Sequence, residues 1–148
     1  MFRTIQVVSL LLLLAGVVVL QGVARGGQTM VDELPVVHGA ADVPETELAK
    51  EKGALREFVE GFVRDGARVE GTRFFLVPSN TPWVAVESEL GSAIEAGGTM
   101  QRQRFDWHRP GYELVDVWQG DGRRIAVAMT YDALPDGRRL LGYFELDR

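Results

Sequence analysis

The best spacing for acid–base chemistry in this chain lies around His108. Asp106 and His108 alternate along a predicted strand, so their side chains point to one face, and Glu113 follows across a turn. A carboxylate beside an imidazole is the arrangement that orients a general base. His108 also adjoins the Arg-Pro-Gly turn at 109–111, where it needs no catalytic role. We expect no catalytic residue, and keep as the alternative a small extracytoplasmic hydrolase-like enzyme that uses His108 with Asp106 or Glu113.

Other kinds of chemistry have weaker support in the sequence. There is no Cys, no Gly-x-Ser-x-Gly elbow, no His-Glu-x-x-His pair and no phosphate-binding or dinucleotide-binding loop. His38 has no second metal ligand nearby, so we expect a solvated loop residue, no metal and no cofactor. The net charge of −5, without a basic cluster, argues against a nucleic-acid partner. Carboxylates on one predicted helix are expected to face solvent; these are Glu87, Glu89 and Glu95.

Aromatic side chains on neighbouring predicted strands give the binding hypothesis. If Trp107, Tyr112 and Trp118 share an uncovered face of the sheet, they form an apolar platform edged by Arg102 and Arg104. The alternative is that these aromatic residues lie in the core beneath the helices. The candidate binding residues are Trp107, Tyr112, Trp118, Arg102, Arg104 and His108.

Residues 1–24 have the pattern of a signal peptide or a membrane anchor. Arg3 precedes an apolar run, and small residues end the segment at Ala24. Residues 25–43 lack a helical or strand period and are expected to form a flexible arm or an arm lying on the domain. Residues 44–148 are expected to form a single domain. The domain is therefore predicted to be periplasmic or secreted, or tethered to the inner membrane by residues 5–24. Its Arg-rich, Gly-rich and Lys-poor composition is typical of bacteria with GC-rich genomes.

Two amphipathic helices are predicted. The first begins near Asp42, where a cap, a Pro and an acidic residue follow one another, and it ends before Gly66. The second has Thr81 as its N-cap and Pro82 at its first position. Each carries one apolar stripe with helical spacing, formed by Leu55, Phe58, Val59, Phe62 and Val63 in the first and by Trp83, Val86, Leu90, Ala93 and Ile94 in the second.

The remaining segments predict strands. A short apolar strand covers 73–77, and four more follow at about 100–107, 112–119, 124–131 and 139–146. Asp-Gly at 121–122 suits a type I′ hairpin, and Pro-Asp-Gly at 135–137 suits a turn with its glycine in the left-handed region. The chain is therefore predicted to be an α+β two-layer sandwich, with an antiparallel meander sheet of about five strands covered by two helices.

Both helices are expected on one face of this sheet. Ile125, Val127 and Met129 then point to the helices, and the open face carries Arg124, Ala126, Ala128 and Thr130. We expect a non-catalytic binding domain whose partner is an unknown protein or a small apolar ligand of the cell envelope. Membrane contact is expected only through an uncleaved N-terminal segment. A strongly curved sheet enclosing a small apolar ligand in a cone is a further alternative.

Overall fold

The computed structural model describes residues 29–63, 66–103 and 114–147. These residues form an antiparallel sheet and two α-helices, which confirms the α+β class, the antiparallel sheet and the two helices. In chain order the elements are η1 (Met30–Glu33), β1 (Ala41–Asp42), α2 (Ala49–Val63), β2 (Val69–Pro78), α3 (Trp83–Glu95), β3 (Gln101–Gln103), β4 (Leu114–Gly120), β5 (Arg123–Met129) and β6 (Arg138–Leu146).

The sheet has the strand order β1-β2-β6-β5-β4-β3, and every neighbouring pair is antiparallel. The last four strands form the predicted meander, and β6 then lies beside β2. β3 pairs with β4 through Gln101 opposite Gln119 and Gln103 opposite Val117, as expected for the strand predicted from residue 100. The rest of that predicted strand lies outside the described residues.

Both turns predicted from their residue types are confirmed. Asp121 and Gly122 connect β4 to β5 with φ angles of 49° and 73°, the positive values that a type I′ turn requires. Gly137 has a φ angle of 81° and donates its N–H to the Leu134 carbonyl at 2.8 Å. These turns fix the register of the meander.

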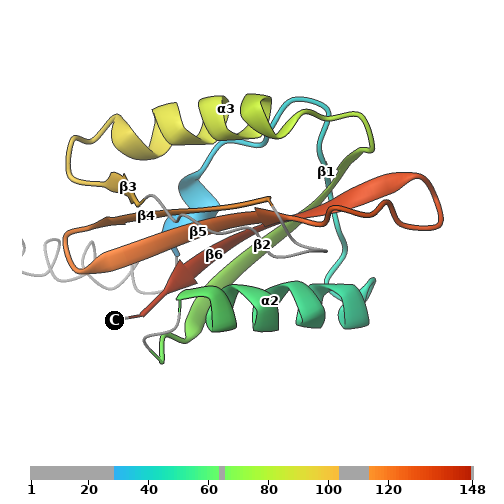
Figure 1. The fold of residues 1–148 in the computed structure, drawn as a ribbon, viewed down its shortest axis with the longest axis horizontal. Coiled ribbons are helices and arrows are strands. Elements are labelled where there is room, and N and C mark those ends of the chain that lie inside the picture. The colour runs from blue at the N-terminus through green and yellow to red at the C-terminus, as the bar shows by residue number, and fades with distance from the viewer. Residues whose placement is uncertain (1–28, 64–65, 104–113, 148) are drawn as a thin grey trace, which may run out of the picture.

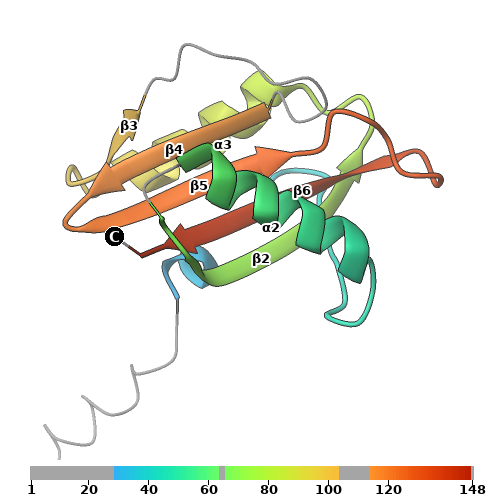
Figure 2. The same ribbon diagram turned by 60° about the horizontal axis from the view of Figure 1, so that its bottom comes forward.

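The prediction that both helices cover one face is wrong: they lie on opposite faces of the sheet, so each face has its own core (Figure 1). Figure 2 shows α2 crossing β2, β6 and β5. The α3 face buries Phe75, Val77, Val86, Leu90, Ile94, Trp118, Ile125, Val127, Met129, Leu141 and Tyr143. The α2 face buries Leu55, Val59, Phe62, Val63, Leu76, Val117, Ala126, Ala128, Leu140, Phe144 and Leu146.

The expected open face of β5 is therefore wrong. Ile125, Val127 and Met129 do point to a helix, α3, but Ala126 and Ala128 are both fully buried beneath α2. The sequence alternation in β5 is between large and small apolar residues rather than between apolar and polar ones. Both sets of side chains are consequently compatible with burial.

Both helix starts differ from prediction. Asp42 lies in β1 opposite Phe75, and Val43 donates its N–H to the Phe74 carbonyl at 3.1 Å. Pairing with the sheet thus takes the residues that resembled a helix cap, and α2 begins only at Ala49. In α3 the N-cap is Pro82 rather than Thr81, and the Pro82 carbonyl accepts the N–H of Ala85 at 3.0 Å.

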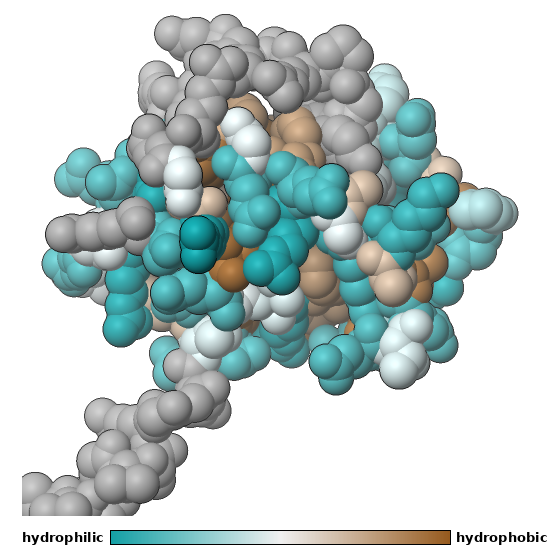
Figure 3. Space-filling model, turned by 90° about the horizontal axis from the view of Figure 1, so that it is seen from below, coloured by the Kyte–Doolittle hydropathy of each residue, from teal (hydrophilic) through white to brown (hydrophobic). Residues whose placement is uncertain are grey.

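The apolar stripes are mostly as predicted. Four of the five stripe residues of α2 are buried, with Phe58 partly buried. In α3, Ala93 is exposed, and Gly91 takes a buried place instead, where a Cβ would lie 3.4 Å from the Trp118 ring. Figure 3 looks onto the α2 side and shows hydrophilic side chains over most of that surface, as expected for the outer side of an amphipathic helix.

Residues 29–43 of the predicted arm lie against the sheet. Val31 and Val37 are buried in the core of the α3 face. The Tyr143 hydroxyl donates to the Pro35 carbonyl at 3.0 Å, and the Met30 N–H donates to Glu145 at 2.6 Å. This part of the arm therefore contributes to the packing of the domain.

Candidate functional site

Two of the six candidate binding residues lie in the part of the chain that the structure describes. Trp118 is only 1% exposed and packs beneath α3, where its Nε1–H donates to Glu95 at 2.9 Å. It therefore belongs to the core and is not displayed on an open face. Arg102 lies beside it on β3. The remaining candidates, Trp107, Tyr112, Arg104 and His108, lie outside the described residues, as do Asp106 and Glu113.

Three charged side chains from three elements meet next to Trp118. Asp116 on β4 is only 7% exposed, and Arg102 on β3 reaches both of its carboxylate oxygens. The Arg102 Nε donates at 3.0 Å and its Nη2 at 2.7 and 2.8 Å. The same Nη2 also forms an ion pair with Glu87 on α3. Fork-shaped guanidinium contacts of this kind hold carboxylates in a fixed geometry.

The two carboxyl groups in this cluster titrate differently. Burial raises the pKa of Asp116 to about 7, and the hydrogen bond with Glu87 acts in the same direction, while Arg102 opposes both. Burial also acts to raise the pKa of Glu87, but the hydrogen bond with Asp116 and the charge of Arg102 outweigh it and lower that pKa. The pair therefore keeps its last proton on Asp116 and its negative charge on Glu87.

The expected solvation of the α3 carboxylates is confirmed for Glu89 and Glu95, which are exposed, but is wrong for Glu87, which is partly buried. Glu87 pairs with Arg102, Glu95 accepts from Trp118, and Glu89 accepts the backbone N–H of His38 at 3.3 Å. A signal for the cluster is present in the sequence. Asp116 interrupts an apolar face of its strand, and a buried acid needs a partner.

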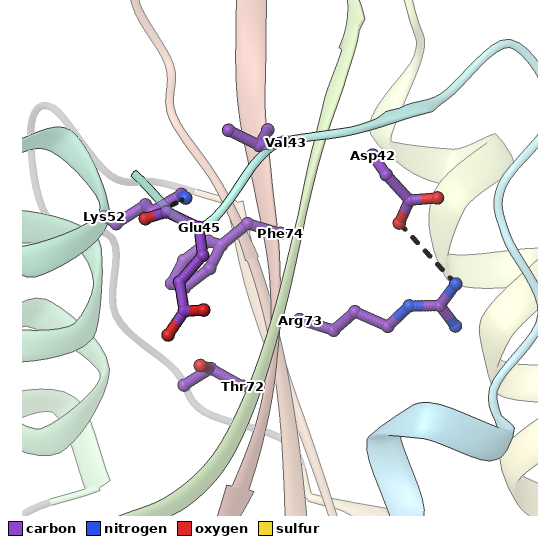
Figure 4. A pocket seen from close by; sticks show the side chains of 7 residues that line it. All are labelled: Asp42, Val43, Glu45, Lys52, Thr72, Arg73 and Phe74. Carbon is purple, nitrogen blue, oxygen red and sulfur yellow. Dashed lines mark hydrogen bonds and ion pairs between the residues drawn. The ribbon is translucent and has the colours of Figure 1, made fainter. Parts of the chain in front are cut away.

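A pocket of about 420 Å³ opens at the other edge of the sheet, between α2 and the β1–β2 edge (Figure 4). Its lining residues are Asp42, Val43, Glu45, Lys52, Thr72, Arg73 and Phe74. The Phe74, Thr72, Glu45 and Lys52 side chains lie on the α2 side of β2, whereas Arg73 points the other way, toward Asp42.

The cations of this pocket are already engaged within the domain. Lys52 donates to the Pro44 carbonyl at 2.6 Å and lies 5.7 Å from the centre of the Phe74 ring. Arg73 pairs with Asp42 at 3.6 Å and donates to the Leu34 carbonyl at 3.3 Å. The Phe74 ring is partly exposed, and the Thr72 and Glu45 side chains are exposed. These three groups offer an apolar surface, a hydroxyl and a carboxylate to a ligand.

The backbone of β2 is only partly covered at this edge. β1 pairs with Phe75 and Leu76, and the Val43 N–H reaches the Phe74 carbonyl. Because polar groups alternate along an antiparallel strand, the N–H and C=O of Thr72 point to the same outer edge as those of Phe74. Among the described residues, no strand pairs with Thr72 on that side.

Farther along β2 the edge is closed by side chains. Arg56 donates to the Val69 carbonyl at 3.0 Å, and Glu60 accepts the Val69 N–H at 3.1 Å. Side-chain capping of this kind protects an edge strand from uncontrolled pairing. The open stretch at Thr72 is thus short and lies directly beside the pocket.

No group of three or more acidic or His residues in the described ranges could hold a metal ion. Across residues 29–63, 66–103 and 114–147, no helix has the length and hydrophobicity needed to cross a membrane. No protein-family model matches the chain, and comparison with curated proteins and with solved structures gives no significant match.

Proposed function

We propose that this chain is a non-catalytic binding domain of the bacterial cell envelope, exported or tethered to the inner membrane, that binds an extended segment of another protein at the outer edge of β2. The observation that carries the proposal is the pocket beside Thr72, where β1 has ended and the β2 backbone still points outward. A strand added here gains main-chain hydrogen bonds, and a neighbouring pocket supplies side-chain specificity.

The pocket chemistry suits one side chain of such a segment. About 420 Å³ accommodates a large residue, and the Phe74 ring provides an apolar floor. The Glu45 carboxylate and the Thr72 hydroxyl supply acceptors at the rim (Figure 4). A small apolar ligand resting on Phe74 is the second candidate, favoured by the same partly exposed ring.

Export is supported by residues 1–24, whose charged start, apolar centre and small-residue end are typical of a leader. If cleavage follows Ala24, the mature protein begins at Arg25. Intact-mass measurement on the exported fraction tests this directly. Recovery only in membranes with Met1 retained supports the tether instead.

Selection of binding peptides from a random library, followed by affinity measurement, tests the binding proposal. Thr72→Pro removes an outward N–H without removing a bond to β6, so the fold should survive. We expect selected peptides to bind this variant at least about tenfold more weakly, the cost of roughly one lost hydrogen bond. Ser92→Ala on the exposed side of α3 is the matched control. Unchanged affinity for both Thr72→Pro and Glu45→Ala would contradict the proposal.

A further inference from the structure

The cluster of Glu87, Arg102 and Asp116 joins three elements at one corner of the sheet, α3, β3 and β4. β3 is three residues long and pairs only with β4 among the described strands. α3 lies over the same corner and meets the sheet mainly through β4. The Arg102 guanidinium links β3 to both other elements, since it binds Asp116 on β4 and Glu87 on α3. The state of this cluster therefore affects how firmly α3 and β3 are held.

The charges in the cluster do not balance when both carboxyl groups are ionised. Two carboxylates then face a single guanidinium, and the more buried of them, Asp116, is poorly solvated. Across the sheet, the residue opposite Asp116 on β5 is Val127, which offers no charge or hydrogen bond. Within the described residues, Glu87 and Arg102 are thus the charged groups that face Asp116. One proton bound by the carboxyl pair makes the cluster neutral and turns repulsion into a hydrogen bond.

We propose that these three residues form a proton-operated lock, which holds α3 and β3 against β4 while the carboxyl pair retains one proton and loosens them when that proton is released to solvent. In the closed state the Asp116 hydroxyl donates to the Glu87 carboxylate and Arg102 donates to both groups. In the open state two carboxylates compete for Arg102.

The sign of the pH effect follows from the raised pKa of Asp116. Its usual value is 3.8, and its folded value is about 7. The folded protein therefore holds a proton that the unfolded chain has already released, and this stabilisation is lost as the pH rises through about 7. The lock closes on the acidic side of neutrality and opens on the alkaline side.

Amide hydrogen exchange of the purified protein at pH 6 and pH 8, corrected for intrinsic rates, tests the lock. We expect protection of the α3 amides between Val86 and Ile94 to fall by about tenfold from pH 6 to pH 8, the limit for release of one proton from a group with a pKa of about 7, while the α2 amides remain constant. Asp116→Asn keeps a donor toward Glu87 and an acceptor for Arg102, so it should hold the closed state at both pH values. Glu87→Gln removes the like charge and should reduce the difference, with the effect of Asp116 burial remaining.

Glu57→Gln, an exposed carboxylate on α2, is the matched control and should behave as wild type. The lock is refuted if α3 protection in the wild-type protein is the same at pH 6 and pH 8. It is also refuted if Glu87→Gln retains the full pH dependence, a result that can be read even if Asp116→Asn fails to fold.

Discussion

The two faces of the sheet are covered by helices of similar length that are held in different ways. Beneath α2, β4 and β5 contribute small residues, Val117, Ala126 and Ala128, and the cluster there is apolar. Beneath α3 the same two strands contribute Trp118, Ile125, Val127 and Met129, together with the polar cluster around Asp116. α2 is held by apolar packing and by the contacts of Arg56 and Glu60 with the Val69 backbone, whereas α3 packs on larger residues of β4 and β5 and binds the buried cluster around Asp116.

The difference shows how one strand can serve two cores. β5 alternates between large and small apolar side chains, so neither face carries an unpaired polar group in its middle. Polar contacts act together with the apolar packing of Val86, Leu90 and Ile94 to fix the position of α3, because hydrogen bonds and ion pairs are directional and dispersion contacts are not. Beneath α2, the stripe of Leu55, Val59 and Phe62 meets small residues of β4 and β5 together with larger residues of β6, which are Leu140, Phe144 and Leu146.

The largest expected loss of stability comes from placing a charge beneath either helix. Val127→Asp and Ala128→Asp each place a charge in a core, one beneath α3 and one beneath α2. Each should cost about 3–5 kcal/mol, because a buried charge without a partner is poorly solvated. Denaturant titration measures the loss in free energy of unfolding for each variant. A cost below about 1 kcal/mol for Ala128→Asp would mean that α2 does not cover that face.

An intermediate loss of stability is expected when a side chain is added to the core beneath α2. A Cβ at Gly142 would lie 2.6 Å from the Phe144 ring and 3.1 Å from the Phe74 ring, which pack edge to face. Gly142→Val should therefore destabilise the domain by about 1–3 kcal/mol through overpacking.

Gly61→Ala is the control for this substitution. It lies in α2, where an added Cβ meets nothing within 4 Å, and it should stabilise the helix by about 0.5–1 kcal/mol. A neutral Gly142→Val, with Gly61→Ala stabilising as expected, would show that the packing beneath α2 is loose.

The smallest expected loss of stability comes from removing the hydrogen bond between Trp118 and Glu95. Glu95→Leu leaves the buried indole N–H without its acceptor and should lower the free energy of unfolding by about 1 kcal/mol. Glu95→Gln keeps an acceptor oxygen and should cost clearly less. Thermal unfolding of both variants measures the difference, and equal costs would remove this bond from the explanation of how α3 is held.

Much of the fold could be predicted from local signals. The two apolar stripes, the meander and both glycine turns follow from spacing and turn chemistry, and the structure confirms them. The placement of the helices could not be predicted, because a stripe shows that a helix is buried but not which face buries it. Asp42 was misassigned for a related reason: the pattern of a helix cap does not reveal that β2 has an edge in need of a partner.

The candidate sites were harder to predict from the sequence than the fold. Glu87, Arg102 and Asp116 lie on three separate elements, and only the fold brings them together. The edge pocket likewise combines residues from the loop before α2 with residues of β2. The residue types on neighbouring predicted strands did identify Arg102 and Trp118 as candidates, and these residues pair across β3 and β4, but Trp118 lies in the core rather than on an open face.

The most direct test of the binding proposal uses the absence of Cys from this chain. Thr72→Cys places a single thiol at the exposed edge of β2, and Ser92→Cys places one on the exposed side of α3. We predict that a saturating selected peptide slows alkylation of the thiol at position 72 at least about tenfold, as expected for a site covered when bound, and leaves position 92 unchanged. Equal alkylation of position 72 with and without peptide, or protection at position 92 alone, would contradict binding at the β2 edge.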